Sequence, residues 1–299
     1  MNIATSFPIN TARVVDVLGY ASGLGASNPD CARGPSILLP LLEARLGGRG
    51  VATRISVHRP VGVGDPTAVT ADLCSRLAND VAASATGSHF SVIGGDHSMA
   101  IGTWSGAGRA VPGPLGLIWI DAHLDAHTPA TTPSGRLHGM PVAALLGHGD
   151  RRLTALAGPR TAAIAPEHLT IIGVRSYEVA EAALLARLGV RVITMEDVRY
   201  DSFAVALAVA LQRARRGTAG FGISIDLDAF DPEDAPGVSA PVSGGLRRDQ
   251  VLPALHDLAE YPDLRGVEVA EFSPQHDRSG RTARLAVDLI ATTLFGRSK

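Results

Sequence analysis

Cysteine is scarce in this sequence: Cys31 and Cys74 are the only two among 299 residues, and no CxxC pair occurs. Two cysteines do not make the disulfide framework of a small secreted protein. We therefore expect both thiols to be reduced and to act as small apolar filler.

Long hydrophobic runs and blocks of like charge are also missing. The most apolar stretch, residues 203–211, is too short to cross a bilayer. Residues 1–10 lack the charged start and the apolar run of a signal peptide. The net charge is −2 with both signs scattered along the chain, so neither a nucleic-acid surface nor a basic membrane-binding helix is predicted. We expect a soluble, cytoplasmic protein with no nucleic-acid or membrane partner.

Apolar residues are plentiful, 45% against 19% charged, which is enough for a large core. Because no internal repeat or long linker interrupts the chain, we expect residues 1–299 to form a single domain. Short β-branched runs alternate with longer Ala- and Leu-rich patterns, which predicts an α/β fold with a largely parallel sheet. The predicted strands are residues 13–18, 52–57, 89–93, 115–120, 169–174, 190–194, 220–225 and 264–269. The predicted helices are residues 35–46, 68–85, 99–109, 139–146, 179–188, 202–215, 248–260 and 282–294.

Ligands of open α/β sheets bind beyond the carboxyl ends of the strands, so the residues that follow each strand are the candidates for chemistry. The strand predicted over residues 89–93 is followed by Gly94-Gly95-Asp96-His97-Ser98. The glycines allow a sharp turn, after which His97 projects at this edge. A single histidine in this position is more often structural, so a functional role for His97 depends on its neighbours.

The strand predicted over residues 115–120 ends in Asp121-Ala122-His123-Leu124-Asp125. Side chains alternate along an extended segment, so Asp121, His123 and Asp125 are predicted to share one face. Carboxylates at this spacing repel each other, and burying them costs several kcal/mol unless a cation neutralises them. The segment therefore predicts a metal site.

The strand predicted over residues 220–225 repeats this pattern with Asp226-Leu227-Asp228. Asp226 and Asp228 are again predicted on one face. A further acid, Asp231, precedes Pro232 and is better explained as a turn-forming side chain.

Together these segments offer four carboxylates and two imidazoles. Two divalent cations would balance the negative charge, whereas a single zinc ion would leave an excess. The oxygen-rich donor set favours Mn²⁺ or a similarly hard ion over zinc. With Asp121 and Asp226 as bridging ligands, two ions would lie about 3.5 Å apart, the usual spacing of two-metal hydrolytic sites.

The motifs GGDHS (94–98), DAHLD (121–125) and SIDLDAFDP (224–232) resemble, in the same order, the three metal motifs of the arginase/agmatinase (ureohydrolase) family. The similarity runs from about Gly23 to the C-terminal helix, and the three motifs together are very specific. The resemblance implies a three-layer α/β/α fold with a parallel sheet of eight strands, two Mn²⁺ per subunit, and a homo-oligomer that is a trimer or a hexamer. It assigns the metal ligands as follows: His97 and Asp125 to one ion, His123 and Asp228 to the other, and Asp121 and Asp226 as bridges.

Within the family, residues 127–139 look most like arginase. The resemblance implies that Ser134 contacts a substrate carboxylate, that His138 shuttles protons and that Glu271 holds the guanidinium group. We further expect Asp125 to pass a proton toward the leaving amine. The implied reaction converts L-arginine or a close guanidino acid to urea and an amine. A plain turn residue is an equally good interpretation of Ser134.

Two positions depart from the arginase pattern. Arginases usually have Asn where His127 stands, at the end that receives the substrate carboxylate. They commonly have Asp at Glu178, on the side that holds the α-amino group. Glu181 is a second candidate there, although an acid early in a helix is better explained by the helix dipole. Residues 235–241 and 280–284 look somewhat like the formimidoylglutamase branch.

Several functions remain open from the sequence. Agmatine, guanidinobutyrate and formimidoylglutamate are alternative substrates within the family. A non-catalytic metal-binding homologue and a deacetylase-like single-zinc enzyme are alternatives from other classes. The complete set of six ligands argues against the first, and His123 within DAHLD argues against the second.

Overall fold

A single parallel sheet forms the centre of the molecule. The computed structural model describes residues 13–86 and 89–296, and this part of the chain contains eight strands. They are β1 (Arg13–Tyr20), β2 (Val51–His58), β3 (Phe90–Ile93), β4 (Gly116–Ile120), β5 (Leu169–Val174), β6 (Arg191–Thr194), β7 (Phe221–Asp226) and β8 (Leu264–Ala270). Their order in the sheet is β2-β1-β3-β8-β7-β4-β5-β6, and every neighbouring pair is parallel. The predicted α/β class and the eight-stranded parallel sheet are confirmed.

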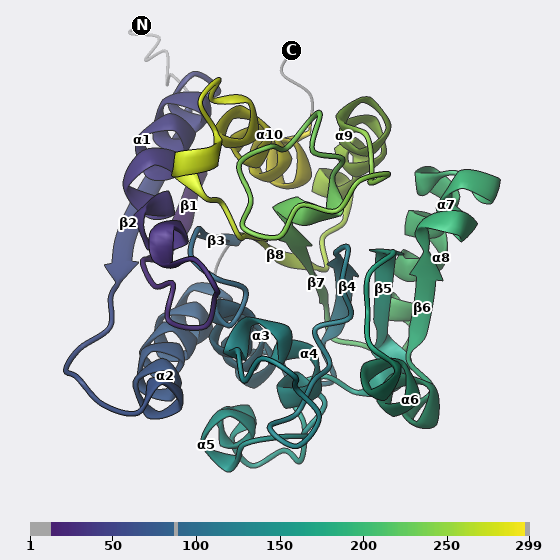
Figure 1. Ribbon diagram of the computed structural model, residues 1–299. Coiled ribbons are helices and arrows are strands. Elements are labelled where there is room, and N and C mark those ends of the chain that lie inside the picture. The colour runs from purple at the N-terminus through teal and green to yellow at the C-terminus, as the bar shows by residue number, and fades with distance from the viewer. Residues whose placement is uncertain (1–12, 87–88, 297–299) are drawn as a thin grey trace, which may run out of the picture.

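Helices cover both faces of this sheet, which gives three layers (Figure 1). They are α1 (Gly34–Gly47), α2 (Pro66–Ser84), α3 (Met99–Ala110), α4 (Pro141–Leu145), α5 (Arg151–Thr154), α6 (Val179–Leu188), α7 (Met195–Asp201), α8 (Phe203–Arg215), α9 (Arg248–Leu255) and α10 (Arg281–Phe295). Buried residues of α1, α7, α8, α9 and α10 pack in one hydrophobic cluster, and those of α2, α3, α4 and α6 in a second. Among the described helices, none combines the length and apolarity needed to cross a membrane.

The central strands are buried on both faces because their residues are almost continuously apolar. Every residue of β3, β4, β5 and β7 is buried, whereas the middle of the edge strand β2 is largely exposed. Covering both faces of a sheet with helices leaves only its ends open to solvent. A site on this fold therefore has to form at the edge where the strands end.

Helix ends and short helices differ from the sequence predictions. The helix predicted over residues 248–260 is α-helical only to Leu255 and continues as a 3₁₀ turn, His256–Glu260. Pro253 lies within it, lacks the N–H of a normal helical residue and crowds the preceding turn. Neither α5 nor α7 was predicted, because both are too short for a helical period to show. The Thr194 and Asp197 side chains, which form a capping box, were the available signal for α7.

The strand order gathers the candidate residues in the middle of the sheet. β3, β8, β7 and β4 are neighbours there, although they are far apart along the chain. The segments that follow these four strands carry His97, Glu271, Asp228 and Asp121, while Asp226 is the last residue of β7. Because all strands are parallel, these segments leave the sheet at the same edge.

The turn after β3 depends on glycine. Gly94 and Gly95 have φ angles of 81° and 77°, in the left-handed region that favours glycine. A Cβ on Gly95 would overlap the carbonyl oxygen and ring of Tyr20 at the end of β1. The Glu271 amide donates to the Gly95 carbonyl at 2.9 Å, which ties this turn to the segment after β8.

Replacing Gly95 with alanine should therefore destabilise the protein more than the same change at Gly50. Gly50 also has a positive φ, 71°, but a Cβ there would meet nothing within 4 Å. Gly50→Ala should cost about 1–2 kcal/mol for the left-handed backbone alone. Gly95→Ala should add about 1–3 kcal/mol for the overlap with Tyr20. Urea unfolding of both variants measures the difference, and equal losses would show that contact with Tyr20 does not constrain the turn.

Candidate metal centre

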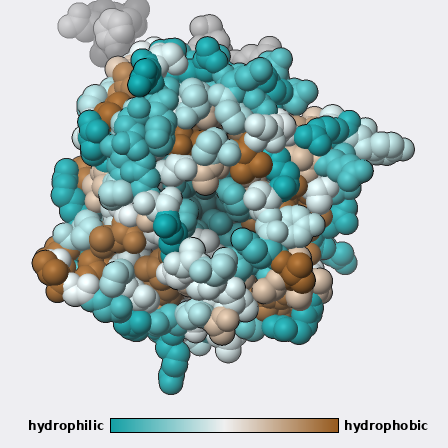
Figure 2. All heavy atoms as spheres, in the orientation of Figure 1, coloured by the Kyte–Doolittle hydropathy of each residue, from teal (hydrophilic) through white to brown (hydrophobic). Residues whose placement is uncertain are grey.

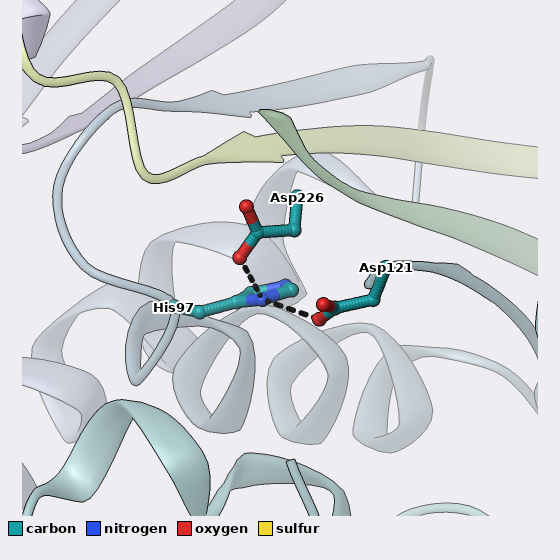
Figure 3. A group of neighbouring side chains, drawn as sticks. All are labelled: His97, Asp121 and Asp226. Atoms are coloured by element: carbon teal, nitrogen blue, oxygen red, sulfur yellow. Dashed lines mark ion pairs between the residues drawn. The ribbon is translucent and has the colours of Figure 1, made fainter. Parts of the chain in front are cut away.

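His97 is surrounded by carboxylates from two other strand ends. Its Nδ1 lies 3.3 Å from Asp121 Oδ2, 3.2 Å from Asp125 Oδ2 and 3.0 Å from Asp226 Oδ2. Figure 3 shows its ring between the carboxylates of Asp121 and Asp226, with the nitrogen facing both. His97, Asp121 and Asp226 form one group whose ligand atoms lie close enough to hold a single ion.

A second group lies beside the first and shares one member with it. His123 Nδ1 lies 3.1 Å from Asp228 Oδ2 and 3.5 Å from Asp121 Oδ1. Asp121 therefore faces His97 with one oxygen and His123 with the other, as a bridging carboxylate would. Asp226 contacts His97 through Oδ2, while its Oδ1 accepts a hydrogen bond from the Asp228 amide at 2.8 Å.

The DAHLD segment brings its side chains together through a loop. β4 ends at Ile120, and Asp125 has a φ of 49°, so the shared face of an extended segment that the sequence analysis assumed is wrong. Asp125 nevertheless reaches His97, with its Oδ2 3.2 Å from His97 Nδ1. The Ala126 amide donates to Glu181 Oε1 at 3.0 Å and fixes the loop just after Asp125.

The donor chemistry of the two groups fits a pair of cations. Asp121, Asp125, Asp226 and Asp228 are all buried and would carry negative charge together. His97 Nδ1 is buried, and no described residue makes a hydrogen bond of good geometry with it. A buried nitrogen without a hydrogen-bond partner, facing three carboxylate oxygens, is the environment of a metal ligand.

The pKa shifts of His97, Asp125 and Asp226 also indicate a site for cations. Burial and the Asp121 charge raise the pKa of Asp125 to about 7, against the opposing effect of the two histidines. Burial and the charges of Asp228 and Asp121 raise the pKa of Asp226 well above its ordinary value. Burial lowers the pKa of His97, but the surrounding carboxylates outweigh it and raise that pKa well above the ordinary value. Without a metal, Asp226 and His97 would therefore hold protons near neutral pH, and dications would replace those protons.

A cavity of about 220 Å³ opens above the two groups. Figure 2 shows a hollow near the middle of its face, teal inside and bordered by teal, white and brown surface. The predicted site residues that line the cavity are His123, Asp125, His127, Ser134, His138, Glu178, Glu181, Asp226, Asp228 and Glu271. A larger cavity, about 470 Å³, lies where β1 and β8 begin, at the opposite edge of the sheet, and none of the predicted site residues lines it.

Glu271 and His138 form a pair on the wall of this cavity. His138 Nδ1 lies 3.1 Å from Glu271 Oε1, and the same oxygen accepts from the His97 amide at 2.9 Å. Burial lowers the pKa of His138, but its hydrogen bond with Glu271 and the nearby negative charges raise it to about 9. Burial raises the pKa of Glu271, but the contact with His138 outweighs it and keeps that pKa below its ordinary value. Glu271 has a φ of 65°, a strained backbone of the kind found at functional sites.

The outer end of the cavity holds the two residues that depart from the arginase pattern. His127 Nε2 lies 3.1 Å from Glu178 Oε2 and 3.4 Å from Glu181 Oε2. Glu181 accepts a hydrogen bond from the Glu178 amide in a capping box at the start of α6. The prediction that Glu181 stabilises the beginning of this helix therefore describes part of its role. Ser134 is exposed in a turn, where its Oγ accepts from the Arg136 amide at 3.3 Å.

Sequence reasoning missed several residues that hold the centre in place. Trp119 Nε1 donates to Asp121 Oδ2 at 2.9 Å, and the Arg175 guanidinium donates to the Asp228 carbonyl at 2.7 Å. Ser224 and Glu268 lie fully buried on β7 and β8, close to His97. Ser224 and Glu268 could have been noticed in the sequence, because each is a polar residue inside a strand predicted to be buried on both faces.

Taken together, the fold and the site define a class: α/β proteins with a candidate two-metal site at the carboxyl edge of a parallel sheet, an arrangement suited to hydrolysis. The sequence model of the Arginase family matches residues 15–296. An arginase of Brevibacillus brevis is 41% identical over 222 residues, which are 74% of this chain and 74% of that protein. An arginase of Bacillus caldovelox is 41% identical over 205 residues, 69% of this chain and 68% of that protein.

Solved structures agree with these sequence matches. The crystal structure of arginase from Bacillus subtilis has a TM-score of 0.89 at 31% identity, and the match covers 96% of this chain and 100% of that chain. The chain belongs to the arginase family.

Proposed function

We propose that this protein is a dimanganese amidinohydrolase that converts L-arginine, or a close guanidino acid, and water to urea and an amine. The observation that carries the proposal is the pair of His/Asp groups that share Asp121 at the floor of a cavity walled by Glu271 and His138. Membership of a family of guanidino-group hydrolases, with relatives that are arginases, supports the same reaction.

In the proposed centre, His97 and Asp125 would hold one ion and His123 and Asp228 the other, with Asp121 and Asp226 as ligands to both. The carboxylate-rich donor set favours Mn²⁺ over zinc. When bound, two such ions acidify a water molecule and so supply the nucleophile that an unreactive guanidinium carbon requires.

The side chains around the cavity orient the substrate and move protons. Glu271 pairs with the guanidinium group, and the His97 amide and His138 hold its carboxylate in place. Asp125 lines the cavity beside the proposed ions, so its carboxylate can accept a proton and pass it toward the leaving amine. His138 is partly exposed, so it can exchange protons with solvent.

The far end of the cavity would receive the amino-acid end of the substrate. We assign the carboxylate to Ser134 and His127 and the amino group to Glu178, with Glu181 behind it. His127 and Glu178 hydrogen-bond to each other at 3.1 Å, so a substrate has to share or displace that bond. On the family resemblance we also propose a cytoplasmic homo-oligomer, a trimer or a hexamer, with residues 1–299 as one domain.

Alanine at two positions separates metal binding from proton transfer. Asp226→Ala should lose a metal ion and abolish turnover, because Asp226 contacts His97 in the first ligand group. His138→Ala should keep both ions and lower the rate by about 10²–10⁴-fold, the usual contribution of a general acid–base group. Metal content by elemental analysis and urea release measure the two effects.

Asp231→Ala is the matched control for this pair. Asp231 lies five residues beyond Asp226, and its carboxylate accepts from the amides of Glu233, Gly244 and Gly245. We expect its loss to weaken the turn while both ions stay bound. Full activity of the Asp226→Ala protein would rule out the two-metal mechanism.

A comparison of four substrates tests the proposed specificity. We expect urea release from L-arginine to exceed that from agmatine and from guanidinobutyrate, which lack the carboxylate and the amino group respectively. Formamide release from formimidoylglutamate should be lower still. Preference for agmatine would leave Ser134 and His127 without a role and would reassign the protein to another reaction of the family. Bound metal without hydrolysis of any of the four would indicate a non-catalytic homologue.

A further inference from the structure

Glu268 is an acidic residue within a buried strand. It lies within β8, opposite Ser224 of β7 and Val92 of β3, and its side chain is fully buried. Glu268 Oε2 is buried and finds no hydrogen-bond partner in the described part of the chain. Burying a half-satisfied carboxylate opposes folding, so a purely structural role at this position would be better served by an apolar side chain.

A short chain of hydrogen bonds leads from Glu268 to His97. Ser224 Oγ donates to Glu268 Oε1 at 2.6 Å, and Trp104 Nε1 donates to the same oxygen at 3.2 Å. The hydroxyl has one proton, and that proton is directed at Glu268. Ser224 Oγ can therefore only accept from His97 Nε2, which lies 2.9 Å away.

The direction of the hydrogen bond between His97 and Ser224 decides which ring nitrogen of His97 can bind a metal ion. A histidine that binds a metal ion is neutral and carries one ring proton, so a proton on Nε2 donated to Ser224 leaves Nδ1 with its lone pair for the ion. Nδ1 is the atom that faces Asp121 and Asp226 (Figure 3). Trp119 stacks on the imidazole with ring centroids 4.2 Å apart and planes 16° apart, which fixes the plane of the ring.

The packing around Glu268 preserves this arrangement. Trp104 lies against Gly222 of β7 so closely that a Cβ there would overlap its ring. Only a glycine at that point lets the indole reach Glu268. Glu268 Oε1 therefore accepts hydrogen bonds from Trp104 of α3 and from Ser224 of β7.

We propose that Glu268 is a positioning residue that acts through Ser224 to fix the tautomer and the orientation of His97 as a metal ligand. The inference rests on the metal centre of the proposed function, but not on the identity of the substrate. Outer hydrogen-bond partners of metal-binding histidines commonly change metal affinity by about 10–100-fold when removed.

Binding of Mn²⁺ alone to the metal-stripped full-length protein tests this role. We expect Ser224→Ala and Glu268→Leu each to weaken the binding of one Mn²⁺ by about 10–100-fold. Glu268→Gln should lose less, since its amide oxygen can still accept from Ser224. Ser91→Ala removes a hydroxyl that is equally buried, on β3, and has no hydrogen-bond partner in the described chain. It is the matched control and should bind Mn²⁺ like the wild type.

The double variant Ser224→Ala/Glu268→Leu distinguishes a relay from two separate effects. If Glu268 acts through Ser224, the double variant should bind Mn²⁺ no more weakly than the weaker-binding single variant. Losses that add, or wild-type affinity in Glu268→Leu, would overturn the proposal. Should Glu268→Leu fail to fold, the same cycle with Glu268→Gln provides the test. Because Mn²⁺ binding is measured without substrate, failure of the relay is distinct from failure of the arginase activity, which wild-type urea release reports.

Discussion

Mutual repulsion among four buried carboxylates is the constraint on which the rest of this structure depends. Asp121, Asp125, Asp226 and Asp228 meet where the central strands end, in contact with the imidazoles of His97 and His123. Burial strengthens their repulsion because the surroundings screen charge poorly. Either protons or cations have to neutralise the group, and the contact of one carboxylate with both imidazoles favours a pair of cations.

The fold supports this concentration of charge with directed hydrogen bonds. The His123 amide donates to Asp121 Oδ1 at 2.7 Å, and the Asp228 amide donates to Asp226 Oδ1 at 2.8 Å. These bonds stabilise the ionised carboxylates and aim their second oxygens at the histidines. Strained backbone at Asp125 and Glu271 completes the arrangement, since both have positive φ without being glycine. The sheet supplies the rigid frame, and the strain lies in the segments that follow it.

Much of this could be predicted from the sequence because its signals are local. Short β-branched runs, several of them continuously apolar, marked all eight strands, and acids and histidines after three of them marked the edge where the metal groups form. The short helix α7 was missed because seven residues show no period. The route by which Asp125 reaches His97 also escaped prediction, because the modest preference of Asp for a positive φ does not single out one aspartate.

Contacts between distant segments set the other limit. The bond between His127 and Glu178 joins residues 51 positions apart, and that between His138 and Glu271 joins residues 133 positions apart. No pattern of spacing reveals such partners, which depend on how the loops after different strands fold back over the sheet. Glu268 was visible only as an acid in an apolar strand, and its role follows from the neighbour that the sheet register places beside it.

Counting the Mn²⁺ ions that the metal-stripped protein binds at saturation tests the central claim most directly. The account predicts two ions per chain, because the excess charge around Asp121 requires two dications. A stoichiometry of one ion per chain, in protein that is folded and fully loaded, would contradict it.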